Sequence, residues 1–153
     1  MEQLIAATDG SCLGNPGRGG WAWYINNVTW RAGGAERTTN NQMELVAVLE
    51  LLRFTADRPE TSLLIFCDSK YVIDALERWR HGWKRRGWRK ADGKEIANKD
   101  LFVQLDAALN GRSVTFEWVK GHNGHPLNEK ADRGARSAAE AIRDGRPINA
   151  GPA

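Results

Sequence analysis

The chain has 153 residues and a formal net charge of +3 at pH 7. That length suits one domain with a hydrophobic core of its own. No apolar stretch approaches the roughly 20 residues of a membrane-spanning helix, and the first residues lack the pattern of a secretory signal, so a membrane protein is not expected. The two cysteines form no CxxC pair, which favours a reducing, cytoplasmic location over a disulfide framework.

Hydrophobic periodicity predicts three strands early in the chain, at about 3–8, 20–26 and 28–36. A glycine-rich loop, residues 10–20, separates the first two, and Asn26-Asn27 is typical of a tight hairpin turn between the others. A helix is predicted at about 42–55, because apolar side chains recur there at helical spacing before Pro59. The continuously apolar run 63–67 predicts a buried parallel strand.

The second half of the chain predicts helices that alternate with a single strand. Helical patterns lie at about 69–77, 79–86 and 98–109, with a polar loop at 87–97. A fifth strand is predicted at 114–119, and Asn128 is suited to cap a final helix that runs to about 143. The elements together predict one α/β domain over residues 1–143, with a mixed five-stranded sheet flanked by helices, and a flexible tail at 144–153.

Positive charge is concentrated in one segment of this domain. Residues 78–99 contain nine Lys or Arg against Asp92 and Glu95, a net charge of +7, which leaves −4 for the rest of the chain. Three of the seven tryptophans, Trp79, Trp83 and Trp88, lie in the same segment, and a merely solvated helix face does not need them. The segment therefore indicates a polyanionic partner held by one element.

Four acidic residues occupy positions where local patterns mark a strand end or a helix start. Asp9 and Asp68 each end an apolar strand, and Glu44 and Asp132 lie early in helical patterns. If the two strands are parallel neighbours, both aspartates lie at the carboxyl edge of the sheet, where ligands bind in open α/β folds. The two helix starts can reach the same edge.

Such a group of carboxylates has two interpretations at this point. Acidic residues are common at helix starts, and capping explains each of them singly. Four carboxylates gathered within a few ångströms instead raise one another's pKa values unless a cation lies between them. Carboxylate oxygens suit Mg²⁺, and two such ions roughly 3.5–4 Å apart catalyse in-line displacement at phosphorus. From the spacing alone, both interpretations stay open.

Polar segments around these acids suit a phosphate-bearing ligand. The glycine-rich loop lets a nucleic acid approach the backbone, although it matches neither the P-loop nor GxGxxG, and a plain hairpin connection is the alternative. Residues 37–41 carry hydrogen-bond donors just before a predicted helix, so they either bind a phosphate at the helix N-terminus or simply cap the helix. His122, ten residues before Asp132, is a candidate for proton transfer. Zinc binding by His122 and His125 is not expected, because no cysteine spacing supports it.

Six motifs follow one another in order over residues 4 to about 140. They are Thr8–Gly17 (TDGSCLGNPG), Arg37–Leu45 (RTTNNQMEL), Asp68–Val72 (DSKYV), Trp83–Trp88 (WKRRGW), Glu117–Glu129 (EWVKGHNGHPLNE) and Ala131-Asp132. Each is weak alone, but the ordered set is highly specific. It closely resembles type 1 ribonuclease H, the bacterial form that cuts the RNA strand of RNA–DNA hybrids. The resemblance implies a five-stranded sheet of order 3-2-1-4-5.

The resemblance also implies roles for individual residues. The four carboxylates that bind two Mg²⁺ ions, for which Mn²⁺ can substitute, are matched by Asp9, Glu44, Asp68 and Asp132. A histidine that assists catalysis by proton transfer or product release is matched by His122. Residues of the family that contact the hybrid near the minor groove correspond to Cys12, Asn15, Asn40 and Asn41. Residues that form part of a pocket for a DNA phosphate correspond to Arg37 and Thr39.

Residues 79–99 match the basic protrusion, or handle, that many bacterial members carry. The substrate contacts expected within it are Trp79, Trp83, Lys84, Arg85 and Arg86. Such a handle holds phosphates without reading sequence, which gives salt-sensitive affinity. We expect Trp79 and Trp83 to pack on sugars or in a small core of the handle, and Trp88 to be a core residue.

Three positions depart from the commoner bacterial pattern. Lys70 stands where glutamine is usual, so a neutral contact to the hybrid becomes a charged phosphate contact. Phe102 replaces a frequent tryptophan, and Asn123 replaces a small residue beside His122. None of these changes touches the four acids, so we expect activity to be retained and substrate affinity to differ.

The expected function is Mg²⁺-dependent, sequence-nonspecific hydrolysis of the RNA strand of a hybrid, leaving 5′-phosphate and 3′-OH ends. A non-catalytic binding module would be expected to lose an acid. A Holliday-junction resolvase or integrase lacks this glycine-rich loop and handle, and a phosphotransferase is disfavoured by the absent Walker lysine motif. We expect a cytoplasmic monomer, with a single-strand DNA-binding protein as a candidate partner besides the hybrid.

Overall fold

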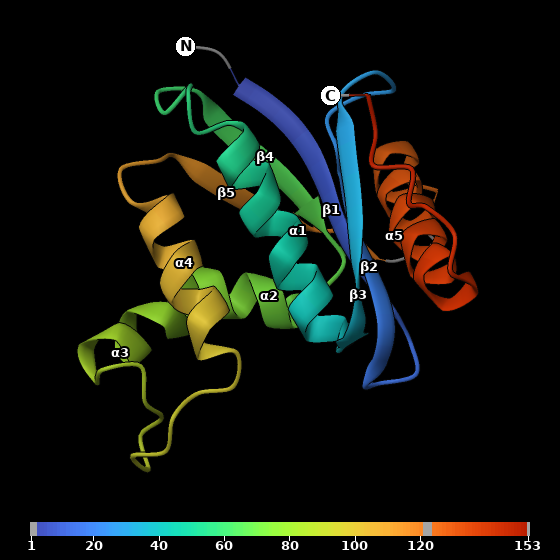
Figure 1. The fold of residues 1–153 in the computed structure, drawn as a ribbon. Coiled ribbons are helices and arrows are strands. Elements are labelled where there is room, and N and C mark those ends of the chain that lie inside the picture. The colour runs from blue at the N-terminus through green and yellow to red at the C-terminus, as the bar shows by residue number, and fades with distance from the viewer. Residues whose placement is uncertain (1–2, 121–123, 153) are drawn as a thin grey trace.

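The structure, a computed structural model, describes residues 3–120 and 124–152. Its centre is a five-stranded sheet with the order β3-β2-β1-β4-β5 (Figure 1). The strands are β1 (Gln3–Leu13), β2 (Gly17–Tyr24), β3 (Trp30–Thr38), β4 (Ser62–Cys67) and β5 (Val114–Trp118). β1 pairs antiparallel with β2 and parallel with β4, and β5 is parallel to β4. The mixed five-stranded sheet is the one that the hydrophobic pattern predicts, and its strand order is the one that the resemblance implies.

Helices cover both faces of the sheet. They are α1 (Asn40–Phe54), α2 (Lys70–Asp74), α3 (Arg80–Arg85), α4 (Lys99–Leu109) and α5 (Pro126–Asp144), with a π-helical turn at Ala75–Trp79. Figure 1 shows α1, α2 and α4 on one side of the sheet and α5 on the other. The main hydrophobic core, which includes Leu45, Ile65 and Phe102, lies on the side of α1. No helix among residues 3–120 and 124–152 is long and apolar enough to cross a membrane.

Small residues let α5 approach the sheet closely. A Cβ on Gly20 of β2 would lie 2.6 Å from the backbone nitrogen of Ala139, a distance that real Cβ atoms do not reach. A second cluster of buried side chains lies between this helix and the sheet and consists of Ala22, Ala32, Ala135 and Ala138. The close packing holds α5, which carries Asp132, against β1, β2 and β3.

The glycine-rich segment is mostly strand, so its interpretation as a loop was wrong. β1 continues past Asp9 to Leu13, β2 begins at Gly17, and Ser11 lies opposite Gly20 in the ladder. Glycine weakens a strand locally, but here the pairing with β2 and the packing against two helices outweigh that preference. Asp9 therefore lies inside a strand and not at its end.

Two further boundaries differ from the predictions. The connection between β2 and β3 spans the five residues 25–29 instead of a two-residue turn, and the Ile25 amide donates to the Thr29 carbonyl at 2.9 Å. The final helix begins at Pro126 and is capped by His125, whose Nδ1 accepts from the Asn128 amide at 3.3 Å. Proline is pre-set for the first helical position, so the helix starts before Asn128, the predicted cap, which is buried in its first turn.

The residues after α5 pack on the edge strand β3. Gly145 ends the helix in the left-handed conformation, with φ +68°. Ile148 then contacts the alanine cluster beneath α5, and the Ala32 amide of β3 donates to the Ala150 carbonyl at 3.0 Å. The segment expected to be a flexible tail thus makes backbone and side-chain contacts with the sheet.

Candidate active site

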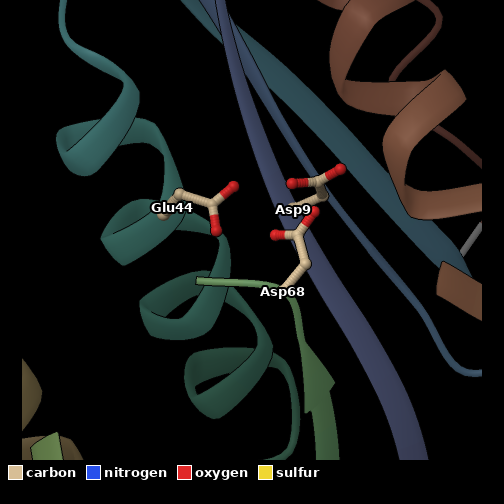
Figure 2. Close-up of side chains that lie close together, drawn as sticks. All are labelled: Asp9, Glu44 and Asp68. Atoms are coloured by element: carbon tan, nitrogen blue, oxygen red, sulfur yellow. The ribbon is translucent and has the colours of Figure 1, made fainter. Parts of the chain in front are cut away.

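The parallel pairing of β1 with β4 brings Asp9 and Asp68 together. The ladder between the two strands ends with Thr8 opposite Cys67, and Asp9 and Asp68 are the residues that directly follow this last pair. Figure 2 shows their carboxylates close to each other and to that of Glu44, which α1 contributes. The prediction that the two aspartates share one edge of the parallel pair is therefore confirmed.

Gly10 allows α1 to bring Glu44 against β1. A Cβ on Gly10 would lie 2.6 Å from the carbonyl carbon of Met43 and closer still to the backbone nitrogen of Glu44. Any side chain at this position would therefore push the helix away from the strand. With glycine in place, the Gly10 amide donates to Asp9 Oδ1 at 2.9 Å and also to Glu44 Oε1.

Three of the four predicted acids form a tight group. One carboxylate oxygen from each of Asp9, Glu44 and Asp68 lies within 4.8 Å of the others. These three acids line an open cleft with a volume of about 330 Å³, and Asp132 of α5 lines it too. Asp132 pairs with Arg136 one turn along its own helix. All four acids predicted from the sequence thus face one cleft, with Asp132 on its wall.

Burial raises the pKa values of two of these acids. Desolvation is the largest cause for Asp9 and raises its pKa to about 7; the hydrogen bond with Glu44 lowers it and the charge of Asp68 raises it. The pKa of Glu44 lies well above its usual value, first through desolvation and then through its hydrogen bond with Asp9. Without a compensating positive charge, ionising this pair is costly.

The ligand atoms in the cleft fit a hard divalent cation. Glu44 Oε2 is buried and has no hydrogen-bond partner within the described ranges of the chain, although buried polar atoms are normally paired. The atoms that Asp9, Glu44 and Asp68 offer are all carboxylate oxygens, which Mg²⁺ and Mn²⁺ prefer, whereas structural zinc sites use cysteine and histidine. The group is therefore suited to Mg²⁺ or Mn²⁺.

Several residues expected to contact substrate lie around these acids. The cleft is also lined by Cys12, Asn40 and Asn41. Asn15 lies in the turn between β1 and β2, and its Oδ1 accepts from the Asn40 amide at 3.2 Å. The turn therefore contacts the start of α1 directly. His122 lies outside the described residues.

Arg37 and Thr39 lie on either side of the last residue of β3. Arg37 is exposed. The Thr39 hydroxyl accepts from the Gln42 amide at 3.1 Å, while Gln42 Oε1 accepts from the Thr39 amide at 3.2 Å. This reciprocal capping box stabilises the first turn of α1. Thr39 thus caps the helix that carries Glu44, one of the alternatives left open by the sequence.

The tryptophans of the handle are divided between core and surface. Trp83 and Trp88 are half-buried and pack on the main core, and the Trp83 ring lies 5.1 Å from that of Phe102. Trp79 is 40% exposed and contacts the Trp83 ring at 5.9 Å. Trp88 therefore packs against the core from a half-buried position, and Trp79 is the most exposed of the three.

The cations of the handle also differ from one another. Asp106 of α4 pairs with Arg80 and, at 2.8 Å, with the Lys84 ammonium. Arg85 and Arg86 are exposed, and Arg86 Nε donates to the Arg89 carbonyl at 3.1 Å. Asp106 therefore ties α3 to α4 and balances part of the positive charge of the handle.

Three residues that shape the site were not singled out from the sequence. Gly10 was noted only as part of a loop, and its contact with α1 is tertiary. Asp106 pairs across two helices, which no local pattern signals. Trp118 is opposite Cys67 in the β4–β5 ladder and donates from Nε1 to the Asp68 carbonyl at 3.2 Å; the predicted parallel register of the two strands could have placed it there.

Comparison with known proteins agrees with this fold and cleft. A family model for RNase H matches residues 1–140. Ribonuclease H of Tropheryma whipplei (strain Twist) is 52% identical over 140 residues, covering 90% of this chain and 85% of that protein. Ribonuclease H of Rhizobium meliloti (strain 1021) is 44% identical over 153 residues, covering 98% of this chain and 99% of that protein. The crystal structure of LC9-RNase H1, a type 1 RNase H with the type 2 active-site motif, has a TM-score of 0.77 at 31% identity, covering 99% of this chain and 77% of that one. The chain therefore belongs to the ribonuclease H family and is a nuclease of the hydrolase class.

Proposed function

We propose that this chain hydrolyses the RNA strand of RNA–DNA hybrids with the help of divalent cations. Membership of the ribonuclease H family supports the substrate class. The observation that carries the proposal is the group formed by the buried Asp9 and Glu44 with the half-buried Asp68, whose carboxylate oxygens lie within 4.8 Å of one another. A non-catalytic binding module has no need of such a group, because clustered buried carboxylates are costly to ionise.

In this proposal the cations are held by Asp9, Glu44, Asp68 and Asp132, with two Mg²⁺ ions during catalysis and Mn²⁺ as a substitute. When bound, the ions supply the positive charge that activates a water for in-line attack at phosphorus and stabilises the leaving oxygen. The Gly10 amide orients two of the carboxylates by donating to both. His122 is proposed to transfer protons or to assist product release. Hydrolysis breaks the P–O3′ bond and leaves a 3′-OH and a 5′-phosphate.

The substrate contacts follow from what surrounds the acids. Only the RNA strand carries a 2′-OH, and we assign its recognition to the short polar residues Cys12, Asn15, Asn40 and Asn41. A DNA phosphate is assigned to Arg37 and Thr39. Sequence-independent phosphate contacts are assigned to Lys70 and, in the handle, to Lys84, Arg85 and Arg86, and contacts to sugars to Trp79 and Trp83.

The deciding experiment compares labelled RNA–DNA hybrid, duplex DNA and duplex RNA, each with Mg²⁺ or EDTA. We expect cleavage of the hybrid alone, only with Mg²⁺, into fragments with 5′-phosphate and 3′-OH ends. Intact hybrid, or cleavage that persists in EDTA, would contradict the proposal. A monomeric state, a cytoplasmic location and a single-strand DNA-binding partner stay predictions.

One substitution tests the role of the acids directly. Asp68→Asn should abolish cleavage while the fold and hybrid binding are retained, because the amide keeps the volume but not the charge. Asp74→Asn is the matched control, since Asp74 is a half-buried residue of α2 that pairs with Arg78 at 3.1 Å. Normal cleavage by Asp68→Asn would exclude the acidic group as the catalytic site.

A further inference from the structure

Trp118 contacts two residues at the edge of the acidic cleft. It is the last residue of β5, and its indole Nε1 donates to the backbone carbonyl of Asp68 at 3.2 Å. The ammonium of Lys70 lies over the same indole ring, 4.4 Å from the ring centroid. One side chain thus links the backbone of a candidate metal ligand to a cation two residues further along the chain.

Packing in the hydrophobic core does not explain this tryptophan. Its side chain is 45% exposed. Within the described part of the chain, the half-buried side chains that pack on the main core include Trp83 and Trp88 but not Trp118. Strand pairing at this point is made by backbone atoms, since the Val119 amide donates to the Cys67 carbonyl at 3.0 Å. What the indole adds is its N–H donor and its π face.

The negative charge of the cleft makes a cation beside it, such as the Lys70 ammonium, favourable for binding a phosphate of the substrate. The cleft is lined by four carboxylates, which repel the phosphates of a nucleic acid. Lys70 begins α2 directly after Asp68-Ser69 and is exposed. A cation–π contact restrains a flexible lysine side chain without neutralising it. Lys84 shows the contrast, because its ammonium lies 2.8 Å from the Asp106 carboxylate.

We propose that Trp118 is a positioning residue with two separate effects. The face of its indole ring holds the Lys70 ammonium for a backbone phosphate of the substrate beside the cleft, and its N–H fixes the main chain at Asp68. The inference rests on the proposed function, in which an RNA–DNA hybrid is the substrate. The ring face then governs hybrid binding, and the N–H governs turnover.

Three single variants separate the two effects. Trp118→Phe keeps an aromatic face and removes the donor, Trp118→Leu removes both, and Lys70→Gln removes the cation. For each variant, kcat and KM are measured on a hybrid with Mg²⁺, and Kd is measured in EDTA at several salt concentrations.

Each variant has its own expected result. Lys70→Gln and Trp118→Leu should raise KM and Kd about two- to five-fold, the size of an exposed cation–π contact. Lys70→Gln should also lower the slope of log Kd against log salt by about one phosphate contact. Trp118→Phe should leave KM within about two-fold and lower kcat about two- to ten-fold, the range of one hydrogen bond.

The double variant Trp118→Leu/Lys70→Gln decides the question. It should bind the hybrid no more weakly than Lys70→Gln alone, because Trp118 acts on binding through Lys70. Additive losses, or an unchanged Kd in Trp118→Leu, would overturn the inference, as would a drop in Tm without any split between kcat and KM. If the unchanged protein fails to cleave the hybrid, the proposed function falls instead, and the Kd values still test the coupling of the two residues.

Discussion

Gly10 and Glu44 lie so close together that the amide of the first donates a hydrogen bond to the carboxylate of the second. The same amide donates to Asp9 at 2.9 Å. Gly10 has no positive φ, so the glycine is required here by the close approach of α1 and not by an unusual backbone conformation. A residue without a side chain thus sets the separation between two of the acids.

Replacing Gly10 by Ala is expected to lower stability and turnover together. The new methyl group would lie 2.6 Å from the Met43 carbonyl carbon, a clash that only a shift of α1 relieves. Overpacking of this kind costs about 1–3 kcal/mol, and a displacement of about 1 Å at a reacting group lowers turnover about 100-fold. Urea unfolding and the rate of hybrid cleavage measure the two effects.

Gly82→Ala is the control for this substitution. The nearest side-chain atoms to a methyl group on Gly82 would be those of Arg86, at 3.5 Å or beyond, and alanine favours a helix over glycine. This variant should be as stable as the original protein or more so. Unchanged turnover in Gly10→Ala would show that the position of Glu44 does not depend on the close approach.

The metal-free protein is expected to lose stability as the pH rises from about 4 to 7. Desolvation is the main cause that raises the folded-state pKa of Asp9 to about 7 and also raises that of Glu44. In the unfolded chain, carboxyl groups have a pKa of about 4. Between these values the folded state binds more protons than the unfolded state, so the free energy of unfolding falls with increasing pH. Urea unfolding in EDTA from pH 4 to pH 8 measures this slope.

Mg²⁺ should reverse this loss where both carboxyl groups are ionised. A cation that binds only the folded state raises the free energy of unfolding by mass action, so its effect should be larger at pH 8 than at pH 5. Asp9→Asn is the control, since it removes one titrating group and should flatten the slope in EDTA. A slope unaffected by this substitution would place the linked protons elsewhere.

The strands could be predicted from local patterns, whereas the convergence of the acids was one of two interpretations until the ordered motifs favoured it. Apolar periodicity marks each strand, and the parallel relation of the strands before Asp9 and Asp68 brings the two acids to one edge. The boundaries were less predictable. β1 extends to Leu13 because β2 pairs with it, and a ladder formed between two segments is not visible in either segment alone.

The ion pairs of the handle could not be predicted from the sequence for the same reason. Its basic residues are evident in the sequence, but their partners are not, because Asp106 reaches Lys84 from a different helix. The sequence predicted substrate contacts for Lys84, Arg85 and Arg86 without distinguishing them, and the tertiary packing does distinguish them. Trp118 was overlooked for a similar reason, since its importance comes from Asp68 and Lys70 on neighbouring elements.

Removing Arg85 and Arg86 is expected to weaken hybrid binding more, per charge, than removing Lys84. The Asp106 pKa is lowered because hydrogen bonds and charges from Lys84 and Arg80 outweigh the opposing desolvation, which indicates that part of the Lys84 charge is already balanced. Arg85→Ala/Arg86→Ala should lower the slope of log Kd against log salt by about two, and Lys84→Ala by less than about one. Fluorescence anisotropy titrations over a range of salt measure both slopes.

Turnover at saturating substrate serves as the control for these handle variants. It should change little, because none of the three residues lines the cleft of the acids. Equal changes in slope per charge for Lys84 and for the two arginines would contradict the balancing role of Asp106.

Deleting residues 146–153 is expected to lower stability without changing turnover. The deletion removes the Ile148 side chain from the alanine cluster and the Ala150 carbonyl from the Ala32 amide. A half-buried isoleucine and one backbone hydrogen bond together contribute about 1–3 kcal/mol. Ile148→Ala should cause roughly half of the loss, while Pro152→Ala, at an exposed position, should cause none. Urea unfolding measures the difference, and a truncated protein as stable as the full chain would mean that these contacts contribute nothing to folding.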